Sequence, residues 1–271
     1  MSTAITLREY IDDYLDERRR LGYLAVEQAY YLRSFDRYTQ ELGSSGLLTI
    51  EIMAQWARQD SHRSKDPLTW ARRLNNLRPF MRWFQQFEPR TEVPDDSIFG
   101  RITGRLTPHI YTEQEIIDLL TTAKQLGPVQ SLRGKIYETL FGLIACAGLR
   151  VSEALSLHNV DVDLKHGIIT IHQTKFGKTR QLPVHESTVR ALQRYRTELN
   201  RSGYSSDDDA YFFVGTRGKR RGMPLSNRQV QRVFGQLREQ LGWQNRGAHH
   251  APRIHDLRHS FVVHRIMQWQ K

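Results

Sequence analysis

The stretch Gly148-Leu149-Arg150-Val151-Ser152-Glu153 joins the end of an apolar helical pattern to the start of a short second helix. A second stretch, His255-Asp256-Leu257-Arg258-His259, follows about a hundred residues later. Each carries an arginine, whose guanidinium is always charged, planar and able to donate two parallel hydrogen bonds. His255 and Arg258 are three residues apart, so a helix presents both side chains on one face. The two stretches therefore predict groups that bind phosphate oxygens.

Composition limits the class of protein. The chain has 271 residues, enough for one large domain or two ordinary ones. Lys and Arg number 40 against 29 Asp and Glu, so the net charge is +11 and favours a polyanionic partner, usually nucleic acid. The alternative interpretation is a globular protein that is basic without having such a partner.

Signals for a membrane or secreted protein are not found in the sequence. No stretch reaches about 18 uninterrupted apolar residues, so no membrane span is expected. The start, Met1-Ser2-Thr3-Ala4, lacks the basic and apolar segments of a signal peptide. Cys146 is the only cysteine, which excludes an intrachain disulfide and a cysteine zinc site, and its apolar surroundings predict a small core residue. We therefore expect a soluble cytoplasmic protein.

Residues 1–88 predict an all-helical domain. Thr6 and Glu9 have the spacing of a capping box and precede the first apolar helical stripe. Pro79 lies in the last helical pattern of this region and is expected to kink or break that helix. Residues 89–107 contain several prolines and glycines with little periodicity, so a linker between domains is expected there.

Residues 108–271 predict a mostly helical second domain with a small antiparallel sheet. Two β-rich runs, at 167–172 and 180–184, flank a basic turn at 174–178, which predicts a hairpin. An apolar helix at 131–147 precedes the runs, and further helical patterns follow them. The expected fold class is therefore mainly α with a small antiparallel β-sheet.

Three features resemble those of the tyrosine recombinases, the phage-integrase-type site-specific recombinases. They are the segment 148–153, the hairpin with Lys175 and Pro183-Val184, and the segment 255–261. Their order and spacing agree with the family, and the helical first domain is similar to the family's core-binding domain. The resemblance implies a helical DNA-binding domain followed by a catalytic domain of the DNA breaking and rejoining type.

The resemblance also implies a reaction and its partners. Members of the family cleave and rejoin DNA strands in site-specific recombination or integration, often of mobile elements. A tyrosine attacks the phosphodiester, and the resulting 3′-phosphotyrosyl link stores the bond energy, so no metal or nucleotide cofactor is implied. The implied partner is double-stranded DNA. The implied assembly is a homo-oligomer, since the family works as a tetramer on two DNA duplexes.

Individual roles follow from the positions that match the family's motif. Arg150 and Arg258 would hold the scissile phosphate and stabilise its transition state, and Glu153 would support the arginine. Lys175 would be the general acid that protonates the leaving 5′ oxygen. His255 would assist proton transfer and also contact the phosphate.

One departure from the family pattern changes the expected activity. In the family a further histidine or tryptophan and then the nucleophilic tyrosine follow the His-x-x-Arg segment, whereas no tyrosine follows Tyr211 in this sequence. We therefore expect a catalytic domain that is incomplete at its C-terminus, in a chain that binds DNA without cleaving it. The alternative function is a non-catalytic DNA-binding regulator derived from a recombinase.

Each motif residue also has an ordinary structural interpretation. Arg150 would be a cation near a helix end, Lys175 a solvated turn lysine, and His255 a hydrogen-bonded core histidine. His255 and His259, four residues apart, also match the spacing of a zinc-binding helix that takes its third ligand elsewhere. The arginine between them would place a cation beside the metal, so no metal site is expected.

Two basic stretches are further candidates for DNA contact. One lies on the fourth predicted helix of the first domain and the other in a Gly-rich loop of the second. The family's architecture implies that the two stretches form a clamp around duplex DNA. The alternative is a pair of solvated faces. Lys178, which is also the alternative general acid, is a further candidate for DNA contact. The residues concerned are Arg72, Arg73, Arg78, Arg82, Lys178, Arg217, Lys219, Arg220 and Arg221.

Overall fold

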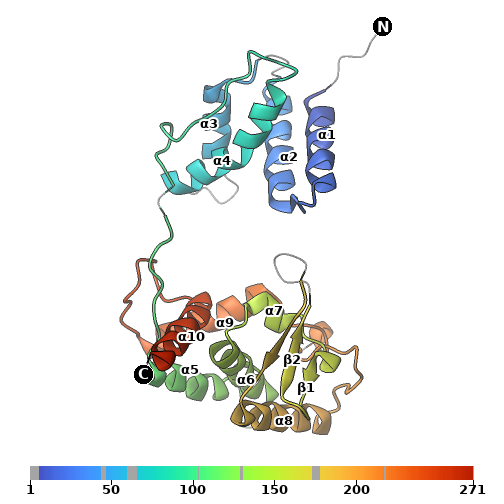
Figure 1. Cartoon of the computed structure of the whole chain (residues 1–271), viewed down its shortest axis with the longest axis vertical. Helices are drawn as coiled ribbons and strands as arrows, with labels where there is room; N and C mark the ends of the chain where they lie inside the picture. Colours follow the sequence, from blue (N-terminus) through green and yellow to red (C-terminus); the bar gives the residue numbers. More distant parts are fainter. Residues whose placement is uncertain are drawn as a thin grey trace. The chain divides into compact units, whose positions relative to one another are not determined.

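Two hydrophobic cores divide the chain. The computed structural model describes residues 6–43, 47–59, 66–102, 104–128, 131–172, 178–216 and 218–270. The chain separates after Gly104 into two compact units, the first ending there and the second starting at Arg105 (Figure 1). Within the described ranges, no helix has the length and apolarity needed to cross a bilayer.

The first unit is built from four helices around an aromatic core. They are α1 (Leu7–Arg20), α2 (Val26–Glu41), α3 (Ile50–Arg58) and α4 (Pro67–Phe84). The predicted capping box is present: Thr6 accepts a hydrogen bond from the backbone of Glu9, and the Glu9 carboxylate accepts one in return. Each helix buries one stripe, and Phe35, Trp56 and Phe80 meet in the shared core.

Of the expected kink or break at Pro79, the break does not occur, since α4 continues through Pro79 to Phe84. A proline inside a helix removes one hydrogen bond and costs about 3 kcal/mol. Phe80, Met81 and Phe84, which follow it directly, are all buried in the core. Burying each such side chain contributes about 1.5–3 kcal/mol, so the three together outweigh the proline.

Part of the predicted linker packs on the first unit. Val93, Ile98 and Phe99 lie against its core, and Thr91 is buried. Arg78 of α4 fixes this segment, since its Nε donates to the carbonyl of Pro94 at 2.7 Å. The chain therefore runs along the first unit for several residues beyond α4 before it reaches the second.

The second unit is mainly helical with a small antiparallel sheet, as the sequence predicts (Figure 1). The apolar helix α6 lies at its centre, and α5, α8 and α10 pack against it. The helices are α5 (Glu113–Lys124), α6 (Leu132–Ala147), α7 (Val151–Leu155), α8 (Glu186–Arg201), α9 (Asn227–Leu241) and α10 (Ile254–Trp269), with short 3₁₀ turns at η1 (Asn159–Asp161) and η2 (Gly218–Arg220).

The sheet contains the predicted hairpin. Strands β1 (Val162–Asp163), β2 (Ile168–Ile171) and β3 (Arg180–Pro183) are ordered β1-β2-β3 and pair antiparallel. The β2–β3 register places Ile171 opposite Arg180. Ile169 and Ile171 are buried, so one face of the hairpin lies on the core and β3 begins at the edge of that core. The turn between the strands lies mostly outside the described residues.

Gly148 forms the corner between α6 and α7. Its φ of +62° is a left-handed conformation that favours glycine, and it ends α6. The ring of Phe261 on α10 occupies the space that a Cβ of Gly148 would need. The carbonyl of Gly148 also accepts a hydrogen bond from Arg258 on α10. Because only a glycine leaves this room, α10 lies directly on the end of α6.

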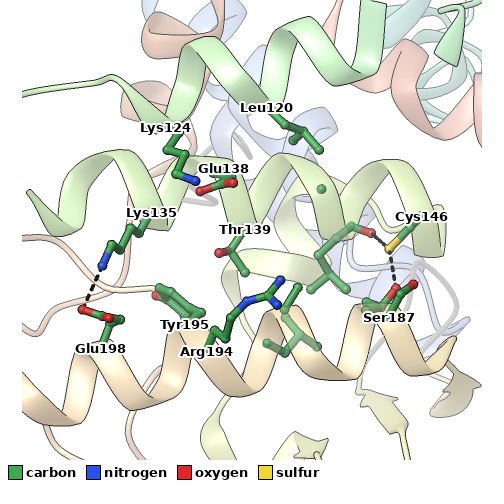
Figure 2. Close-up of a pocket in the computed structure, with 15 residues that line it drawn as sticks. Leu120, Lys124, Lys135, Glu138, Thr139, Cys146, Ser187, Arg194, Tyr195 and Glu198 are labelled. Atoms are coloured by element: carbon green, nitrogen blue, oxygen red, sulfur yellow. Dashed lines mark hydrogen bonds and ion pairs between the residues drawn. The ribbon is translucent and has the colours of Figure 1, made fainter. Parts of the chain in front are cut away.

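The expectation that Cys146 is a core residue is wrong. Its thiol is exposed, on the wall of a pocket of about 450 Å³ between α6 and α8 (Figure 2). The sulfur accepts a hydrogen bond from the hydroxyl of Thr188 at 3.5 Å. The buried stripe of this part of α6 runs through Leu140, Phe141 and Ile144, and Cys146 projects away from it.

Candidate functional site

The site is organised around the carboxylate of Glu153. This residue is the third of α7, and Arg150 is the residue before the helix. The Oε2 atom of Glu153 accepts the backbone N–H of Arg150 at 2.9 Å, and Oε1 accepts its Nη1 at 2.6 Å. The exchange satisfies an N–H that the helix itself leaves unpaired. One helical turn therefore fixes an acid and an arginine against each other.

A second arginine reaches the same carboxylate from the sheet. Arg180, the first residue of β3, donates from Nη1 to Oε1 of Glu153 at 3.1 Å and from Nη2 to Oε2 at 2.7 Å. This two-pronged geometry is the strong form of the arginine–carboxylate pair. Arg180 was not among the residues predicted from the sequence. A usable signal was its position, since it is the only charged residue in the β-rich run at 180–184.

The third arginine comes from α10. Nη1 of Arg258 lies 3.8 Å from Oε2 of Glu153 and donates to the carbonyl of Gly148. The two motifs, more than a hundred residues apart in sequence, thus meet at one carboxylate. Three guanidiniums against one carboxylate leave an excess of two positive charges, a setting that favours an oxyanion with several oxygens.

Burial is graded across the cluster. The side chain of Glu153 is 7% exposed, whereas those of Arg150, Arg180 and Arg258 are 35%, 31% and 28% exposed. The acid therefore lies beneath the cations. Burial by itself would raise the pKa of Glu153, but hydrogen bonds from Arg180 and Arg150 lower that pKa to about 2. The carboxylate is ionised at any physiological pH.

His255 lies on the first turn of α10, one turn before Arg258. The residue is exposed, and its ring contacts that of His259 edge to face at 4.9 Å. Desolvation of the ring, followed by the charges of His259 and Arg253, lowers the pKa of His255 below its usual value. It is neutral at pH 7 and able to accept a proton. No cluster of three or more potential metal ligands occurs among the residues that the structure describes.

The other predicted site residues fall into three groups. Lys175 and Arg217 lie outside the described residues. Arg73 does not lie on the exposed face that a DNA contact requires, and Arg78 is partly buried. Arg73 is buried with its guanidinium over the ring of Trp56, and Arg78 holds the segment after α4. The exposed candidates are Arg72, Arg82, Lys178, Lys219, Arg220 and Arg221.

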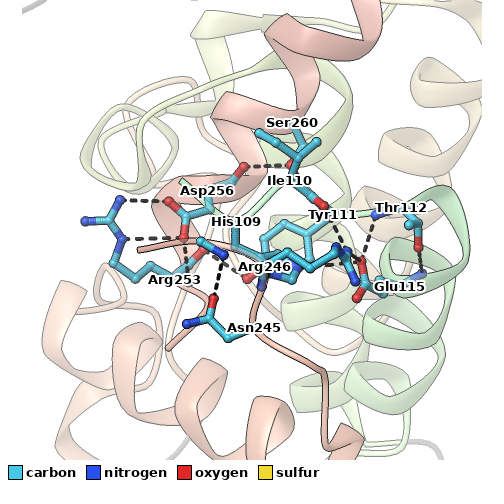
Figure 3. Close-up of polar contacts among 11 residues, drawn as sticks. His109, Ile110, Tyr111, Thr112, Glu115, Asn245, Arg246, Arg253, Asp256 and Ser260 are labelled. Atoms are coloured by element: carbon cyan, nitrogen blue, oxygen red, sulfur yellow. Dashed lines mark hydrogen bonds and ion pairs between the residues drawn. The ribbon is translucent and has the colours of Figure 1, made fainter. Parts of the chain in front are cut away.

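The start of α10 is held by a buried acid. Asp256 is fully buried and accepts hydrogen bonds from the backbone N–H of Arg253 at 2.9 Å and from its Nη2 at 2.8 Å (Figure 3). Ser260 donates to the carbonyl of Asp256 and accepts from the backbone N–H of Tyr111 at 2.7 Å. These bonds fix the helix that carries His255 and Arg258.

The loop before α10 is attached to the first residues of the second unit. The buried His109 accepts at Nδ1 from the backbone N–H of Arg246 at 3.1 Å, and the Arg246 side chain donates to Glu115 and to the Ile110 carbonyl (Figure 3). Burial is the main cause that lowers the pKa of His109. An imidazole that accepts at Nδ1 has to be neutral, so the hydrogen bond and the shift agree.

The structure thus brings three arginines from distant segments to one carboxylate within a mainly helical unit. The profile of the phage integrase family matches residues 110–267, more than half of the chain. The chain therefore belongs to the phage integrase family, the tyrosine recombinases.

Relatives match along nearly the whole chain. An integrase/recombinase of Sinorhizobium fredii, y4rB, is 32% identical over 268 residues, covering 97% of this chain and 83% of the relative. The tyrosine recombinase XerC of Proteus mirabilis is 28% identical over 277 residues, covering 97% of this chain and 84% of XerC.

Two solved structures share the fold at low sequence identity. The Tn1549 transposon integrase in complex with circular intermediate DNA is similar with a TM-score of 0.65 at 15% identity, covering 99% of this chain and 89% of that one. A lambda integrase tetramer bound to a Holliday junction gives a TM-score of 0.62 at 16% identity, covering 96% and 73%.

Proposed function

We propose that this chain binds double-stranded DNA at a recombination site and supplies the phosphate-binding groups for strand cleavage and rejoining. The convergence of Arg150 and Arg258 on the Glu153 carboxylate carries the proposal, because it places both guanidiniums at one partly exposed point. Membership of the tyrosine recombinases supports it. So do the similar structures, which are recombinases solved with DNA, one of them as a tetramer.

In this reaction a tyrosine oxygen attacks the phosphorus, and the bond from phosphorus to the 5′ oxygen breaks. Negative charge builds on the non-bridging oxygens, where Arg150 and Arg258 donate hydrogen bonds that strengthen in the transition state. His255, whose lowered pKa leaves it neutral at pH 7, would exchange a proton, as the family resemblance implies. Lys175 protonates the leaving 5′ oxygen, as the family resemblance implies. A 5′ hydroxyl from another strand later reverses the attack.

No tyrosine follows the His-x-x-Arg segment within residues 1–271. The last tyrosine of the sequence, Tyr211, precedes the His-x-x-Arg segment, and its ring lies against His158, centroid to centroid at 4.4 Å. We propose that these residues bind the scissile phosphate without forming a covalent link to it. The alternative function is a DNA-binding regulator that occupies recombination sites without cleaving them.

The first experiment measures binding. Duplexes that the chain retains from a random library give its preferred site, and the dissociation constant is then measured from 50 to 200 mM salt. Binding should weaken steeply with salt, and R150A and R258A should each lower the slope of log K against log salt by about one. R201A is the control, since Arg201 on α8 is 72% exposed. Equal slopes in all four proteins would contradict the proposal.

The second experiment tests cleavage with a nicked duplex that traps covalent intermediates. Residues 1–271 should bind it without forming an adduct that survives denaturation. A covalent adduct would refute the proposed absence of a nucleophile. The regulator function additionally requires that the chain inhibit recombination by an active relative at the same site, whereas a chain without any effect on that reaction is not a regulator.

A further inference from the structure

We propose that Arg180 is a positioning residue that neutralises Glu153, so that Arg150 and Arg258 keep their donors for the DNA phosphate. The inference rests on the proposed function and adds a group to it. Arg180 occupies both oxygens of Glu153, with donor–acceptor distances of 3.1 and 2.7 Å. No other side chain among the described residues makes a two-pronged hydrogen bond to this carboxylate.

The charges explain why such a residue is needed. Glu153 is 7% exposed, so water does little to screen its charge. Its other cationic neighbours are Arg150 at 2.6 Å and Arg258 at 3.8 Å, the two residues assigned to the phosphate. Arg150 already gives one side-chain donor to Glu153. Without Arg180 the ionised carboxylate would bind further donors of Arg150 and draw Arg258 into a closed ion pair. Each donor used in that way is lost to an incoming phosphate oxygen.

The geometry separates this role from direct contact with DNA. Arg180 directs two of its donors at the carboxylate, whereas Arg150 directs only one side-chain donor there and Arg258 stays beyond hydrogen-bond distance. The Arg258 donor is used by the Gly148 carbonyl instead. Arg180 thus binds the acid with two donors, whereas Arg150 gives it one side-chain donor and Arg258 gives it none.

A double-mutant cycle tests the inference on the whole chain. The affinity for the selected duplex is measured for the native protein, R180Q, E153Q and R180Q/E153Q. We expect R180Q to bind about tenfold more weakly, the effect of roughly one lost charge-assisted hydrogen bond. In the double variant the affinity should return to near the native value, because the amide introduced by E153Q carries no charge that could capture Arg150 and Arg258. The amide oxygen can still accept the backbone N–H of Arg150.

Each alternative role of Arg180 gives a different pattern. If Arg180 contacts DNA directly, or contributes only net charge, R180Q weakens binding equally in the native and the E153Q background, and the inference is overturned. It is also overturned if R180Q binds like the native protein. Thermal unfolding checks that the variants fold. If R180Q does not fold, R180K decides: it should bind more weakly than the native protein, and E153Q should restore its affinity.

The outcome is separable from that of the proposed function. A native chain that binds DNA without salt dependence, or for which R150A and R258A have no effect, defeats the proposed function itself. A native chain that binds as proposed, combined with an R180Q defect that E153Q does not rescue, defeats only the positioning role. If E153Q restores the DNA affinity of R180Q, and R150A and R258A still bind DNA more weakly than the native protein, both the proposed function and the positioning role are supported.

Discussion

At the scale of single residues, the site depends on one buried acid that remains charged. A carboxylate at 7% exposure is normally destabilised as an ion, yet Glu153 accepts hydrogen bonds from two arginines and from a backbone N–H. Its pKa is about 2, and the ordinary value is 4.5. The difference is a contribution to folding stability as well as to the electrostatics of the site.

Because of this contribution, the free energy of unfolding of the second unit depends on pH in the acidic range. Because the pKa is lower in the folded state, the stabilisation is complete above pH 4.5 and is lost as the pH falls towards 2. The full difference corresponds to on the order of 3 kcal/mol. Urea unfolding between pH 5 and 3 should therefore show a steeper loss for the native protein than for E153Q. Parallel curves for the two proteins would contradict this assignment.

His109 gives a second pH dependence, at higher pH. Its pKa is lowered from 6.5, mainly by burial, while Glu115 opposes the shift and Arg246 adds to it. The neutral form is favoured on folding, so stability is complete above about pH 6.5 and falls below it. We expect the melting temperature of the native protein to drop more between pH 7.5 and 5.5 than that of H109Q, which does not titrate. A drop of the same size in both would exclude His109 as the cause.

At the scale of secondary structure elements, the position of Arg258 in the arginine cluster depends on how α10 packs against the end of α6. Gly148 ends α6 with a positive φ, contacts Phe261 and accepts a hydrogen bond from Arg258. The same contact that ends one helix therefore fixes the arginine of another. The loop before α10 is held by His109, which accepts a hydrogen bond from the backbone of Arg246. The start of α10 is therefore fixed as well as its contact with α6.

The corner at Gly148 predicts that adding one methyl group there, as in G148A, is destabilising, whereas the same change elsewhere in α6 is tolerated. G148A should destabilise the second unit by about 2 kcal/mol or more, since the new Cβ meets the Phe261 ring and the positive φ is strained. It should also weaken DNA binding by moving Arg258. The control is G142A in the same helix, where a Cβ would make an ordinary contact with Leu120 at 3.7 Å. Calorimetry of both variants checks this, and equal melting temperatures would contradict it.

Much of this architecture could be predicted from the sequence because its signals are local. Thr6 with Glu9 gives a cap, Gly148 a helix end, and the alternation around Ile169 a strand. The motif arginines Arg150 and Arg258 were also recognisable, since the residues that flank them resemble those of the tyrosine recombinases.

The remaining features depend on contacts between distant segments. Arg180 lies 27 positions from Glu153 and His109 lies 137 from Arg246, and no periodicity reports such pairs. Charge patterns failed for Arg73, because its guanidinium is buried over Trp56 instead of reaching solvent. A sequence shows that a residue is cationic, whereas only the fold shows what it contacts.

At the scale of the whole molecule, a chain with a net charge of +11 folds into two units, each with its own hydrophobic core. Nothing in either core requires residues of the other, because each cluster is drawn from its own unit. We propose that both units bind DNA. Two DNA-binding units in one chain raise each other's effective concentration at the DNA, which increases affinity without any new contact.

Dividing the chain after Gly104 tests this arrangement. Residues 1–104 and 105–271, made separately, should each unfold cooperatively, and together they should reproduce the helical content of the intact protein. The intact chain should bind the selected duplex at least about tenfold more tightly than either piece. If the second piece alone binds as tightly as the whole chain, the first unit makes no contribution to affinity.

The exposed thiol of Cys146 has a practical consequence. As the sole cysteine, it accepts one fluorophore or spin label without any substitution elsewhere, four residues from Arg150. The neighbouring helices desolvate the sulfur and raise the pKa of the thiol, so alkylation should proceed slowly at neutral pH and quicken under alkaline conditions. A probe attached there would report on the surroundings of the corner where α6 ends against α10.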